Sequence, residues 1–288
     1  MKENNCSILI QSCDSYSDVW EPFFCTFAEY WKNCKYPIFL NTETKKYSYE
    51  TLNIECLNVI NEINIPWGKR LLDCLNRIES DYVISLFDDF VLNDYVNQDK
   101  IEEYINYMEN NEDINVIYLN NAFPDLEKKS ELIEVPIGKD FRLNSAPALW
   151  RKEKLIEYTG NIDTPWAWEY FGTMRTEKKN TVFLTLGTQP DIYRYNYNLG
   201  GAIHGGKWVG SVINPVIEKF NMKIDTSIRG YEDENKKNYN HSLSWNIKFF
   251  IIGFKMVGFK AFRFWHRMNI TILKCAFNKI FRMLKWQK

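Results

Sequence analysis

The feature that most constrains the fold is the alternation of short, β-rich apolar runs with amphipathic helical patterns over residues 7–119. A strand pattern at 7–11 precedes aromatic residues at helical spacing between Trp20 and Trp31, and this strand-then-helix unit recurs. Such alternation is typical of a Rossmann-type α/β fold, a mostly parallel sheet flanked by helices. Strands are predicted at residues 7–11, 37–40, 57–60, 82–87 and 116–119, and helices at 20–31, 71–78 and 101–108.

The pattern loosens after about residue 120 into a mixture of strands and helices. Strand candidates cover residues 181–186 and 191–195, and helix candidates cover 151–158 and 166–175. We expect one domain over residues 1–235, whose second half, about 121–235, shapes the site of a second substrate. Residues 236–288 are expected to form a basic tail with amphipathic helices.

The charges are distributed unevenly, although the net charge of the 288 residues is −1. All 37 Asp and Glu lie in residues 1–234, whereas residues 235–288 contain 12 of the 36 Lys and Arg, so the body carries −13 and the tail +12. A basic segment suits an anionic partner, either membrane headgroups or nucleic acid. Because the acidic body argues against nucleic acid as the main substrate, an anionic membrane surface is the expected partner.

The tail itself is amphipathic. If residues 248–288 form one helix at about 100° per residue, eight of their ten Lys and Arg fall within about 140°. The alternative is a helical hairpin, interrupted near Gly253 and Gly258, that packs its apolar face on the body. In the first case the opposite face lies in the membrane interface, and it carries Phe249, Phe250, Ile252, Phe259 and Met268.

The cysteines and the N-terminus indicate in which cellular compartment the protein is located. Seven cysteines form no C-x-x-C pair and fall mostly on apolar patterns, so we expect a reducing cytoplasm and no structural zinc. The N-terminus lacks the apolar core of a signal peptide, and no uncharged apolar run is long enough to span a bilayer. We therefore expect a cytoplasmic protein, peripheral on the inner face of the cell membrane.

Two adjacent carboxylates, Asp88 and Asp89, directly follow the central strand pattern at 82–87. Ligands of parallel sheets bind beyond the carboxyl ends of the strands, where such a pair can hold a divalent cation against a diphosphate. Asp14 and Asp18 are expected at the same sheet edge, and a Lys-Arg pair at 69–70 opens the helix that leads into this strand. The alternative is a solvated turn in which the aspartates cap backbone donors.

Short motifs follow one another over roughly residues 7–230. They are SILI (7–10), SCD (12–14), WEPFF (20–24), YPIFL (36–40), WGKRLL (67–72), DYVI (81–84), LFDDF (86–90), PALW (147–150), PW (165–166), WE (168–169) and GKW (206–208). In these motifs and in their order the chain resembles the bacterial GT-A-fold glycosyltransferases of capsule and O-antigen (lipopolysaccharide) biosynthesis. In that family an acidic motif after a central strand binds a metal ion and the diphosphate of a sugar nucleotide, and here it reads Asp-Asp-Phe instead of Asp-x-Asp.

The resemblance implies that residues 1–120 bind the nucleotide sugar and residues 121–235 the acceptor. Asp14 would contact the base or ribose, and Asp88 and Asp89 would serve the sugar phosphate and a Mn²⁺ or Mg²⁺ ion. Arg70 would neutralise phosphate charge or pair with the acidic motif. For Arg70 the alternative is a surface ion pair on a helix.

Glu169, in the motif WAWE at 166–169, is the expected general base. An inverting glycosyl transfer needs one carboxylate to take the proton of the acceptor hydroxyl opposite the leaving diphosphate. The flanking residues Trp166 and Trp168 would form a sugar platform and raise the pKa of the carboxylate by desolvation. Asp163 is the reserve candidate, and the alternative for Glu169 is an exposed helix residue beside two core tryptophans.

The glycine-dense stretch 200–208 contains two further candidates. His204 is the one histidine outside the basic tail, and the resemblance implies that a late histidine closes the metal shell. The alternative for His204 is a solvated loop residue. Lys207 suits a diphosphate, because glycines let backbone amides approach an anion and the lysine adds charge, whereas its alternative is a simple turn.

These expectations combine into an inverting enzyme that transfers a sugar from a nucleotide-sugar donor to a lipid-linked oligosaccharide. Two alternatives remain open. A sugar nucleotidyltransferase shares the sheet and the metal carboxylates but normally carries a glycine- and base-rich loop near the first strand, which this sequence lacks. A non-catalytic, membrane-bound scaffold of polysaccharide assembly would leave the Asp-Asp and Trp-Trp-Glu positions as plain surface.

Overall fold

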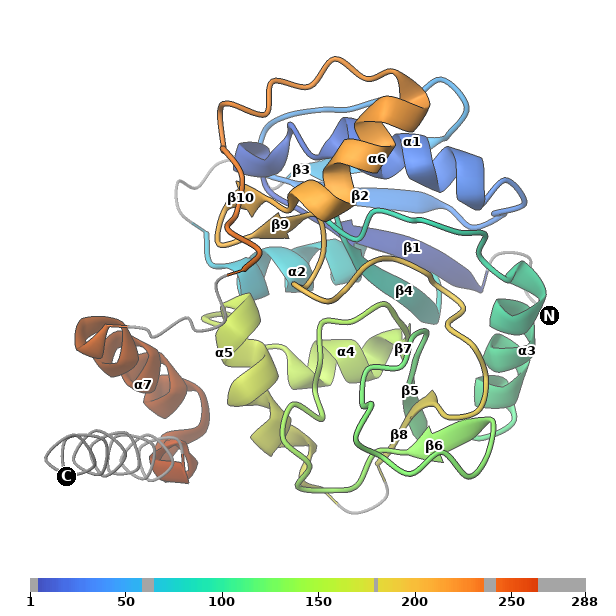
Figure 1. Cartoon of the computed structure of the whole chain (residues 1–288). Helices are drawn as coiled ribbons and strands as arrows, with labels where there is room; N and C mark the ends of the chain where they lie inside the picture. Colours follow the sequence, from blue (N-terminus) through green and yellow to red (C-terminus); the bar gives the residue numbers. More distant parts are fainter. Residues whose placement is uncertain (1–4, 59–64, 179–180, 236–241, 264–288) are drawn as a thin grey trace, which may run out of the picture.

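The computed structural model describes residues 5–58, 65–178, 181–235 and 242–263. Its centre is an eight-stranded sheet with the order β3-β2-β1-β4-β7-β5-β8-β6 (Figure 1). A separate ribbon pairs β9 (Ile203–His204) with β10 (Lys207–Trp208). The strands of the large sheet are β1 (Cys6–Gln11), β2 (Ile38–Thr42), β3 (Ile54–Asn58), β4 (Tyr82–Phe87), β5 (Ile114–Tyr118), β6 (Leu132–Glu134), β7 (Ala148–Arg151) and β8 (Val182–Leu186).

Most neighbouring strands of the large sheet are parallel. β3, β2, β1 and β4 pair in parallel in that order, and β5 pairs in parallel with β8. β7 lies antiparallel between β4 and β5, and β6 is antiparallel to β8 at the edge. The expected α/β class, a mostly parallel sheet flanked by helices, is confirmed.

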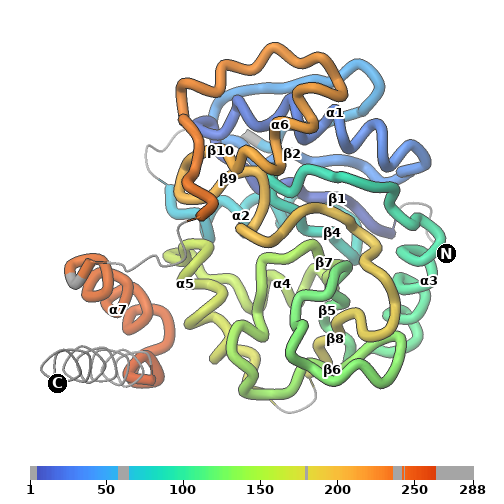
Figure 2. Tube along the Cα trace, in the orientation of Figure 1, coloured from blue at the N-terminus to red at the C-terminus, as the bar shows by residue number. Residues whose placement is uncertain are grey.

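Helices cover both faces of the sheet, which gives three layers (Figures 1 and 2). α1 (Trp20–Tyr30) and α3 (Gln98–Glu109) pack on one face in a single apolar cluster. α2 (Trp67–Arg77), α4 (Lys152–Tyr158) and α5 (Pro165–Tyr170) pack on the opposite face. α6 (Gly210–Phe220) lies against α1 on the outside.

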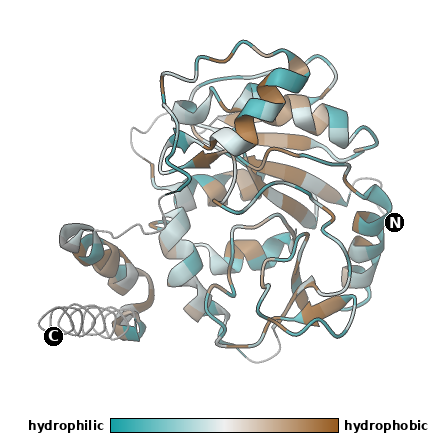
Figure 3. Cartoon of the chain, viewed as in Figure 1, coloured by the Kyte–Doolittle hydropathy of each residue, from teal (hydrophilic) through white to brown (hydrophobic). Residues whose placement is uncertain are grey.

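Strand β1 shows why the chain folds into these layers. All six of its residues are buried, and Figure 3 shows the apolar strands at the centre of the molecule. Ile8 and Ile10 belong to the cluster with α1 and α3, whereas Leu9 between them belongs to the cluster with α2. Successive strand residues point to opposite faces, so an unbroken apolar run suits a strand that is covered on both.

Most of the predicted elements are present, with small changes in their bounds. The strand predicted at 57–60 begins earlier, since β3 covers Ile54–Asn58. Residues 59–64 lie outside the described part of the chain. The strand predicted at 191–195 is wrong: this segment is irregular, and the carbonyl oxygen of Leu119 accepts hydrogen bonds from two of its backbone N–H groups. The sequence pattern does not predict β6, β7 or α6.

The C-terminal part that the structure describes contains α7 (Leu243–Val257) and a short 3₁₀ turn, η3 (Gly258–Ala261). Gly258 ends α7 with a φ of 61°, so the segment from residue 248 onward is not one continuous helix. Among the described residues, no helix combines the length and the apolar character that crossing a membrane requires.

One apolar face of α7 packs on the body. Phe249 is only 8% exposed, and its ring centroid lies 4.9 Å from that of Phe171. The prediction that Phe249 belongs to a membrane face is therefore wrong, and the alternative, an apolar face packed on the body, holds for α7. Met268, predicted for the same face, lies outside the described residues.

Candidate active site

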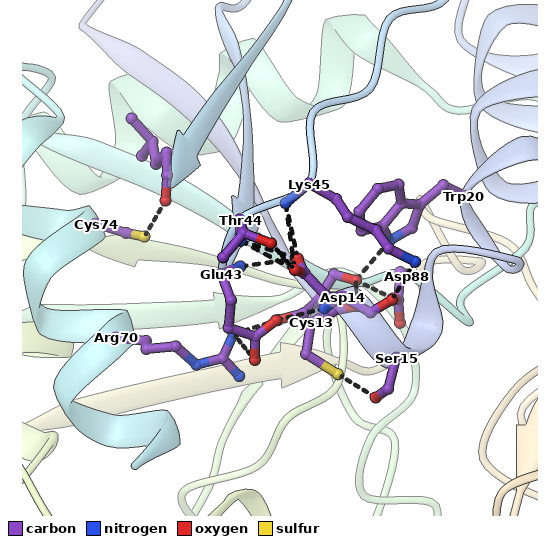
Figure 4. Close-up of polar contacts among 12 residues, drawn as sticks. Cys13, Asp14, Ser15, Trp20, Glu43, Thr44, Lys45, Arg70, Cys74 and Asp88 are labelled. Atoms are coloured by element: carbon purple, nitrogen blue, oxygen red, sulfur yellow. Dashed lines mark hydrogen bonds and ion pairs between the residues drawn. The ribbon is translucent and has the colours of Figure 1, made fainter. Parts of the chain in front are cut away.

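The loops that follow β1, β2 and β4 lie side by side, because these parallel strands end at the same edge of the sheet. Gln11, the last residue of β1, is in register with Asn41 of β2 and with Phe87 of β4. Residues 12–14, 43–45 and 88 therefore meet beyond the strands (Figure 4). This is the edge at which the sequence predicts a binding site.

Asp88 is buried at this edge. Only 3% of the residue is exposed, and its Oδ2 accepts a hydrogen bond from the Ser12 hydroxyl. Trp20 Nε1 donates to Ser12 Oγ at 2.6 Å, so the indole fixes the hydroxyl that holds the carboxylate. Burial raises the pKa of Asp88 to about 7, although the Ser12 hydrogen bond and the charge of Arg229 act to lower it. The carboxyl thus changes its charge near neutral pH.

Asp89 lies under the glycine-dense stretch. The backbone N–H of Ala202 donates to the Asp89 carbonyl oxygen at 2.8 Å. Gly201 has a φ of 153°, and a Cβ atom there would come within 2.8 Å of Asp89 Oδ2, so only glycine allows this close approach. Burial, and then the neighbouring charge of Asp88, raise the pKa of Asp89 well above its usual range. The fold thus joins two motifs that are far apart in the sequence.

The carboxylate oxygens of Asp88 and Asp89 are suitable ligands for a hard divalent cation. Mg²⁺ is commonly held by one or two carboxylates together with waters and substrate phosphates, and a cation relieves the repulsion between two adjacent carboxylates. Across the described parts of the chain, no three His, Cys, Asp or Glu side chains come together as a metal cluster, so His204 does not complete a three-ligand set with them. A substrate phosphate would supply further oxygen ligands.

Asp14 ties the loops after β1 and β2 together (Figure 4). Its carboxylate accepts hydrogen bonds from the backbone N–H groups of Glu43, Thr44 and Lys45 and from the Thr44 hydroxyl. Burial acts to raise the pKa of Asp14, but these hydrogen bonds outweigh it and lower the pKa. The carboxylate is thus engaged by the chain itself, which differs from the expected direct contact with a base or ribose.

Arg70 lies in α2 beneath the same loops. Its Nη1 donates to the Ser12 carbonyl oxygen at 3.0 Å and forms an ion pair with Glu43 Oε1, also at 3.0 Å. The side chain is 8% exposed, so this is not the surface ion pair of the alternative interpretation. Its carboxylate partner is Glu43, a residue that the sequence pattern does not single out, rather than the acidic motif.

Several buried polar atoms at this edge have no hydrogen-bond partner within the part of the chain that the structure describes. They are Gln11 Oε1, Arg70 Nε and both amide atoms of Asn41. Gln11 and Asn41 are register partners at the ends of β1 and β2. Because buried polar groups are normally satisfied, each exception needs an explanation. A ligand with both donors and acceptors would supply the missing partners.

Glu169 of α5 is held by Ser145. Glu169 Oε1 accepts a hydrogen bond from the backbone N–H of Ser145 at 2.8 Å and another from the Ser145 hydroxyl. Ser145 precedes β7, and since β7 is antiparallel to β4 and β5, its first residues lie at the edge where those strands end. Burial raises the pKa of Glu169, although the hydrogen bonds from Ser145 act in the opposite direction. Glu169 is therefore not the exposed residue of the alternative interpretation.

Tyr195 is a buried residue that packs next to the acidic motif. Its ring centroid lies 4.5 Å from that of Phe90, the residue after Asp89. Burial raises the pKa of Tyr195 well above its usual range, and the charges of Asp89 and Glu169 add to this shift. The sequence pattern does not single out Tyr195.

Asp163, the reserve candidate for the base, is fully buried. Its carboxylate forms an ion pair with Arg175 and accepts a hydrogen bond from the backbone N–H of Gly160 at 2.8 Å. These contacts join the loop before α5 to the 3₁₀ turn after it, η2 (Gly172–Thr176). They correct the expectation for Asp163, because a carboxylate closed off in this way holds the fold together and does not reach an acceptor.

The two tryptophans that the sequence predicts as a sugar platform, Trp166 and Trp168, lie in different environments. Trp168 is 3% exposed, and its ring lies 5.7 Å from Trp67 and 6.2 Å from Trp150 in the core. Trp166, in contrast, is 63% exposed on the same helix as Glu169. Trp168 therefore packs in the core, whereas Trp166 is largely exposed to solvent.

His204 and Lys207 are paired residues of the β9–β10 ribbon. The ribbon begins two residues after Gly201, so both side chains belong to the segment that closes on Asp89. Lys207 is exposed, whereas the neighbouring Trp208 is fully buried and anchors the ribbon.

Arg229 is a cation of this edge that the sequence pattern does not predict. Its guanidinium donates to both carboxylate oxygens of Asp18 at 2.6 Å and to the Ser15 carbonyl oxygen at 2.7 Å. Its Cζ lies 4.4 Å from the centre of the Tyr16 ring. Its Nη1 also donates to the carbonyl oxygen of Gly206 at 3.4 Å, in the glycine-dense stretch, and its charge acts to lower the pKa of Asp88. A single basic residue in a loop has no motif that would reveal this.

Comparisons with known proteins bear on the fold. No protein-family model matches the chain, and no curated protein matches it in sequence. The chain is similar to S. aureus TarS 1–349, at 13% identity and a TM-score of 0.45, with 64% of this chain and 58% of that chain covered. This chain therefore spans less than two thirds of the TarS 1–349 length.

Two further solved structures are similar at comparable levels. A galactosyltransferase, LgtC, in complex with donor and acceptor sugar analogs, has 13% identity and a TM-score of 0.35, with 52% of this chain and 59% of that chain covered. A cytidylyltransferase from Leptospira borgpetersenii has 14% identity and a TM-score of 0.44, with 83% and 100% covered. These are similarities of fold alone.

Asp88 predicts a pH dependence of stability in metal-free buffer. Its pKa is about 7 in the folded chain against 3.8 for an ordinary aspartate, so unfolding releases a proton between about pH 4 and 7. The free energy of unfolding should therefore fall as the pH rises through this range. At roughly 1.4 kcal/mol per pKa unit, Asp88→Asn should be more stable than the wild type at pH 8 by up to about 4 kcal/mol. Thermal midpoints check this, and a difference that is the same at pH 5 and pH 8 would contradict it.

Proposed function

We propose that the protein transfers a sugar from a nucleotide-sugar donor to an acceptor hydroxyl. The observation that carries this proposal is that the carboxylates at one edge of the sheet form two separate groups. The buried Asp88 and the half-buried Asp89 form a pair that suits a cation and a diphosphate, and Glu169 stands apart on α5. Trp67 packs on Phe87, the residue before Asp88, and on Trp168, the residue before Glu169, which supports a common site.

Glu169 would act as the general base. It would accept the proton of the acceptor hydroxyl while the acceptor oxygen forms the new bond to the anomeric carbon. The bond from that carbon to the diphosphate oxygen breaks, and the nucleoside diphosphate leaves with the bonding electrons. With the acceptor and the leaving group on opposite sides, the configuration of this carbon is inverted.

The negative charge of the leaving diphosphate needs compensation at the acidic motif. A Mn²⁺ or Mg²⁺ ion would supply it when bound, and Asp88 and Asp89 are the residues that would hold the ion. Lys207, exposed on the segment that covers Asp89, would add a positive charge to the same phosphates. His204 would line this segment without completing a three-ligand metal shell.

The nucleoside end of the donor would bind at the ends of β1 and β2. The unpaired buried atoms of Gln11, Asn41 and Arg70 support this placement, because a nucleobase offers donors and acceptors in one plane. Asp14, held by the loop after β2, would shape the pocket wall. A TarS structure in complex with UDP makes uridine nucleotides the first to test.

We further propose that the acceptor is a lipid-linked oligosaccharide of bacterial capsule or O-antigen biosynthesis, reached at the inner face of the cell membrane. The acid-free basic segment 235–288 supports a location at an anionic membrane. Trp166, exposed on the helix that carries Glu169, offers a flat ring on which an acceptor sugar can lie.

A screen of nucleotide sugars tests the proposed reaction. The full chain is incubated with uridine, guanosine, cytidine and thymidine sugar nucleotides, with and without Mn²⁺ or Mg²⁺, and nucleotide release is measured. We expect turnover with one nucleotide class, and its loss in Asp89→Asn. Pyrophosphate release from a nucleoside triphosphate and a sugar phosphate would instead show a nucleotidyltransferase, and no turnover with any donor would favour a non-catalytic scaffold.

A further inference from the structure

The segment 243–263, which comprises α7, η3 and the two residues after them, has an inner face that is fixed to the body. Phe249 packs on Phe171, and a Cβ atom at Gly253 would come within 2.2 Å of the same ring. Lys260 and Arg263 form ion pairs with Glu177, at the end of η2 (Gly172–Thr176). The apolar residues of this inner face are therefore not available to a partner.

The opposite face of the segment is apolar and exposed. Ile247, Ile251 and Phe254 follow the spacing i, i+4, i+7 on one side of α7 and are 42%, 47% and 40% exposed. Phe259 and Phe262 extend this side and are 83% and 49% exposed. We call these five residues the outer patch, which contains three phenylalanine rings with centroids 5.7 to 6.3 Å apart. Soluble monomers rarely leave such a group of large apolar side chains in water.

Basic residues border the outer patch. Lys248 and Lys255 are exposed and follow Ile247 and Phe254 directly, so they lie on the adjoining side of α7 (Figure 3 shows polar and apolar residues on this helix). The whole segment 235–288 contains 12 Lys and Arg and no Asp or Glu. An anionic bilayer complements both features, because its headgroups attract the lysines and its acyl boundary accepts the phenylalanines.

We propose that the outer patch inserts into the interface of an anionic lipid bilayer, with Lys248 and Lys255 in the headgroup layer. Of the face that the sequence pattern predicts for this purpose, Phe249 packs on the body, whereas Phe259 belongs to the outer patch. α7 contacts α5, the helix that carries Glu169, so docking would hold the proposed base at a fixed distance from the lipid surface. This inference deepens the proposed membrane location but does not depend on sugar transfer, since lipid binding is measured without a substrate.

Vesicle co-sedimentation of the full chain tests this surface. Vesicles of phosphatidylcholine alone are compared with vesicles that contain about 30% phosphatidylserine. We expect the wild type to bind the anionic vesicles, and the combined variant Phe254→Ser, Phe259→Ser and Phe262→Ser to bind at least about tenfold more weakly. Lys248→Gln with Lys255→Gln should also weaken binding about tenfold and reduce its dependence on salt.

Ile228→Ser is the matched control, because Ile228 is an apolar side chain that is 73% exposed on another part of the chain. This variant should bind as the wild type does. Since the replaced phenylalanines are exposed, circular dichroism and the thermal midpoint should show a folded variant.

Three results would overturn the proposal. The first is equal binding of the phenylalanine variant and the wild type to anionic vesicles. The second is equal binding of the wild type to neutral and anionic vesicles, or binding to neither. The third is a wild-type dimer that the phenylalanine variant converts to a monomer without any lipid binding, which would assign the outer patch to a second copy of the chain.

Discussion

Asp89→Asn is expected to lower the rate of sugar transfer at least about a hundredfold, the scale of losing electrostatic stabilisation of a leaving group. The change keeps the shape of the side chain but removes the charge that would hold a cation against the diphosphate. Because burial and Asp88 already disfavour this charge in the folded chain, the neutral amide should not lower the thermal midpoint. Initial transfer rates and a thermal melt measure the two effects separately.

Asp125→Asn is the control for this experiment. Asp125 is an exposed carboxylate that forms an ion pair with Lys139, so its loss should leave transfer unchanged. Wild-type turnover in Asp89→Asn would remove the acidic motif from the site. Activity that survives EDTA would show that the carboxylates act without a metal, and would leave His204 without the ligand role that the resemblance implies.

Glu169→Gln should keep donor binding and lose transfer to the acceptor by about a hundredfold to ten-thousandfold, the range of general-base catalysis. A glutamine can still accept hydrogen bonds from Ser145 through its carbonyl oxygen, so the geometry is preserved, but the amide cannot take a proton. Calorimetry with the donor nucleotide and chromatography of the transfer product measure the two quantities.

Glu153→Gln, an exposed carboxylate on α4, is the matched control and should behave as the wild type. An equal loss of donor affinity in Glu169→Gln would place Glu169 in the nucleotide site. Normal transfer would contradict its role as the base. Asp163→Asn does not test the same role, because the loss of its ion pair with Arg175 should lower the thermal midpoint directly.

The first half of the sheet could be predicted because its signals are local. The strand predicted at 82–87 has the bounds of β4, since a run of apolar residues without polar alternation identifies a strand that is buried on both faces. The position of Asp88 and Asp89 at its carboxyl end follows from that assignment alone. Parallel order then places the loop after β1 at the same edge.

Contacts between distant segments could not be predicted in this way. Gly201 closes on Asp89, Arg229 binds Asp18, and Ser145 holds Glu169, yet none of these pairs belongs to one local pattern. β7 has only four residues, which is too short for a periodic signal. The packing of Asp163 and Trp168 depends on the same long-range contacts, so motif spacing could not separate them from site residues.

The tail illustrates another limit of periodicity. A helix with apolar residues on more than one side satisfies several amphipathic patterns, and the sequence does not say which side the body covers. In the structure Gly253 determines which side of α7 is covered, because the absence of a side chain there lets α7 approach Phe171 closely. The covered side is therefore that of Phe249, and the side of Phe254 is left outside.

The central position of β7 makes the two halves of this chain a single folding unit. β4 and β5 come from the first half, but they do not pair with each other, because β7 from the second half lies between them. A fragment that ends before residue 148 would leave both strands with open edges and would not stand alone as a nucleotide-binding module. Exchanging whole halves between chains of this fold should therefore fail, whereas variation within residues 120–144 leaves Ser145 and every strand of the sheet except β6 in place. New acceptor preferences are expected to arise by variation of that segment rather than by recombination of domains.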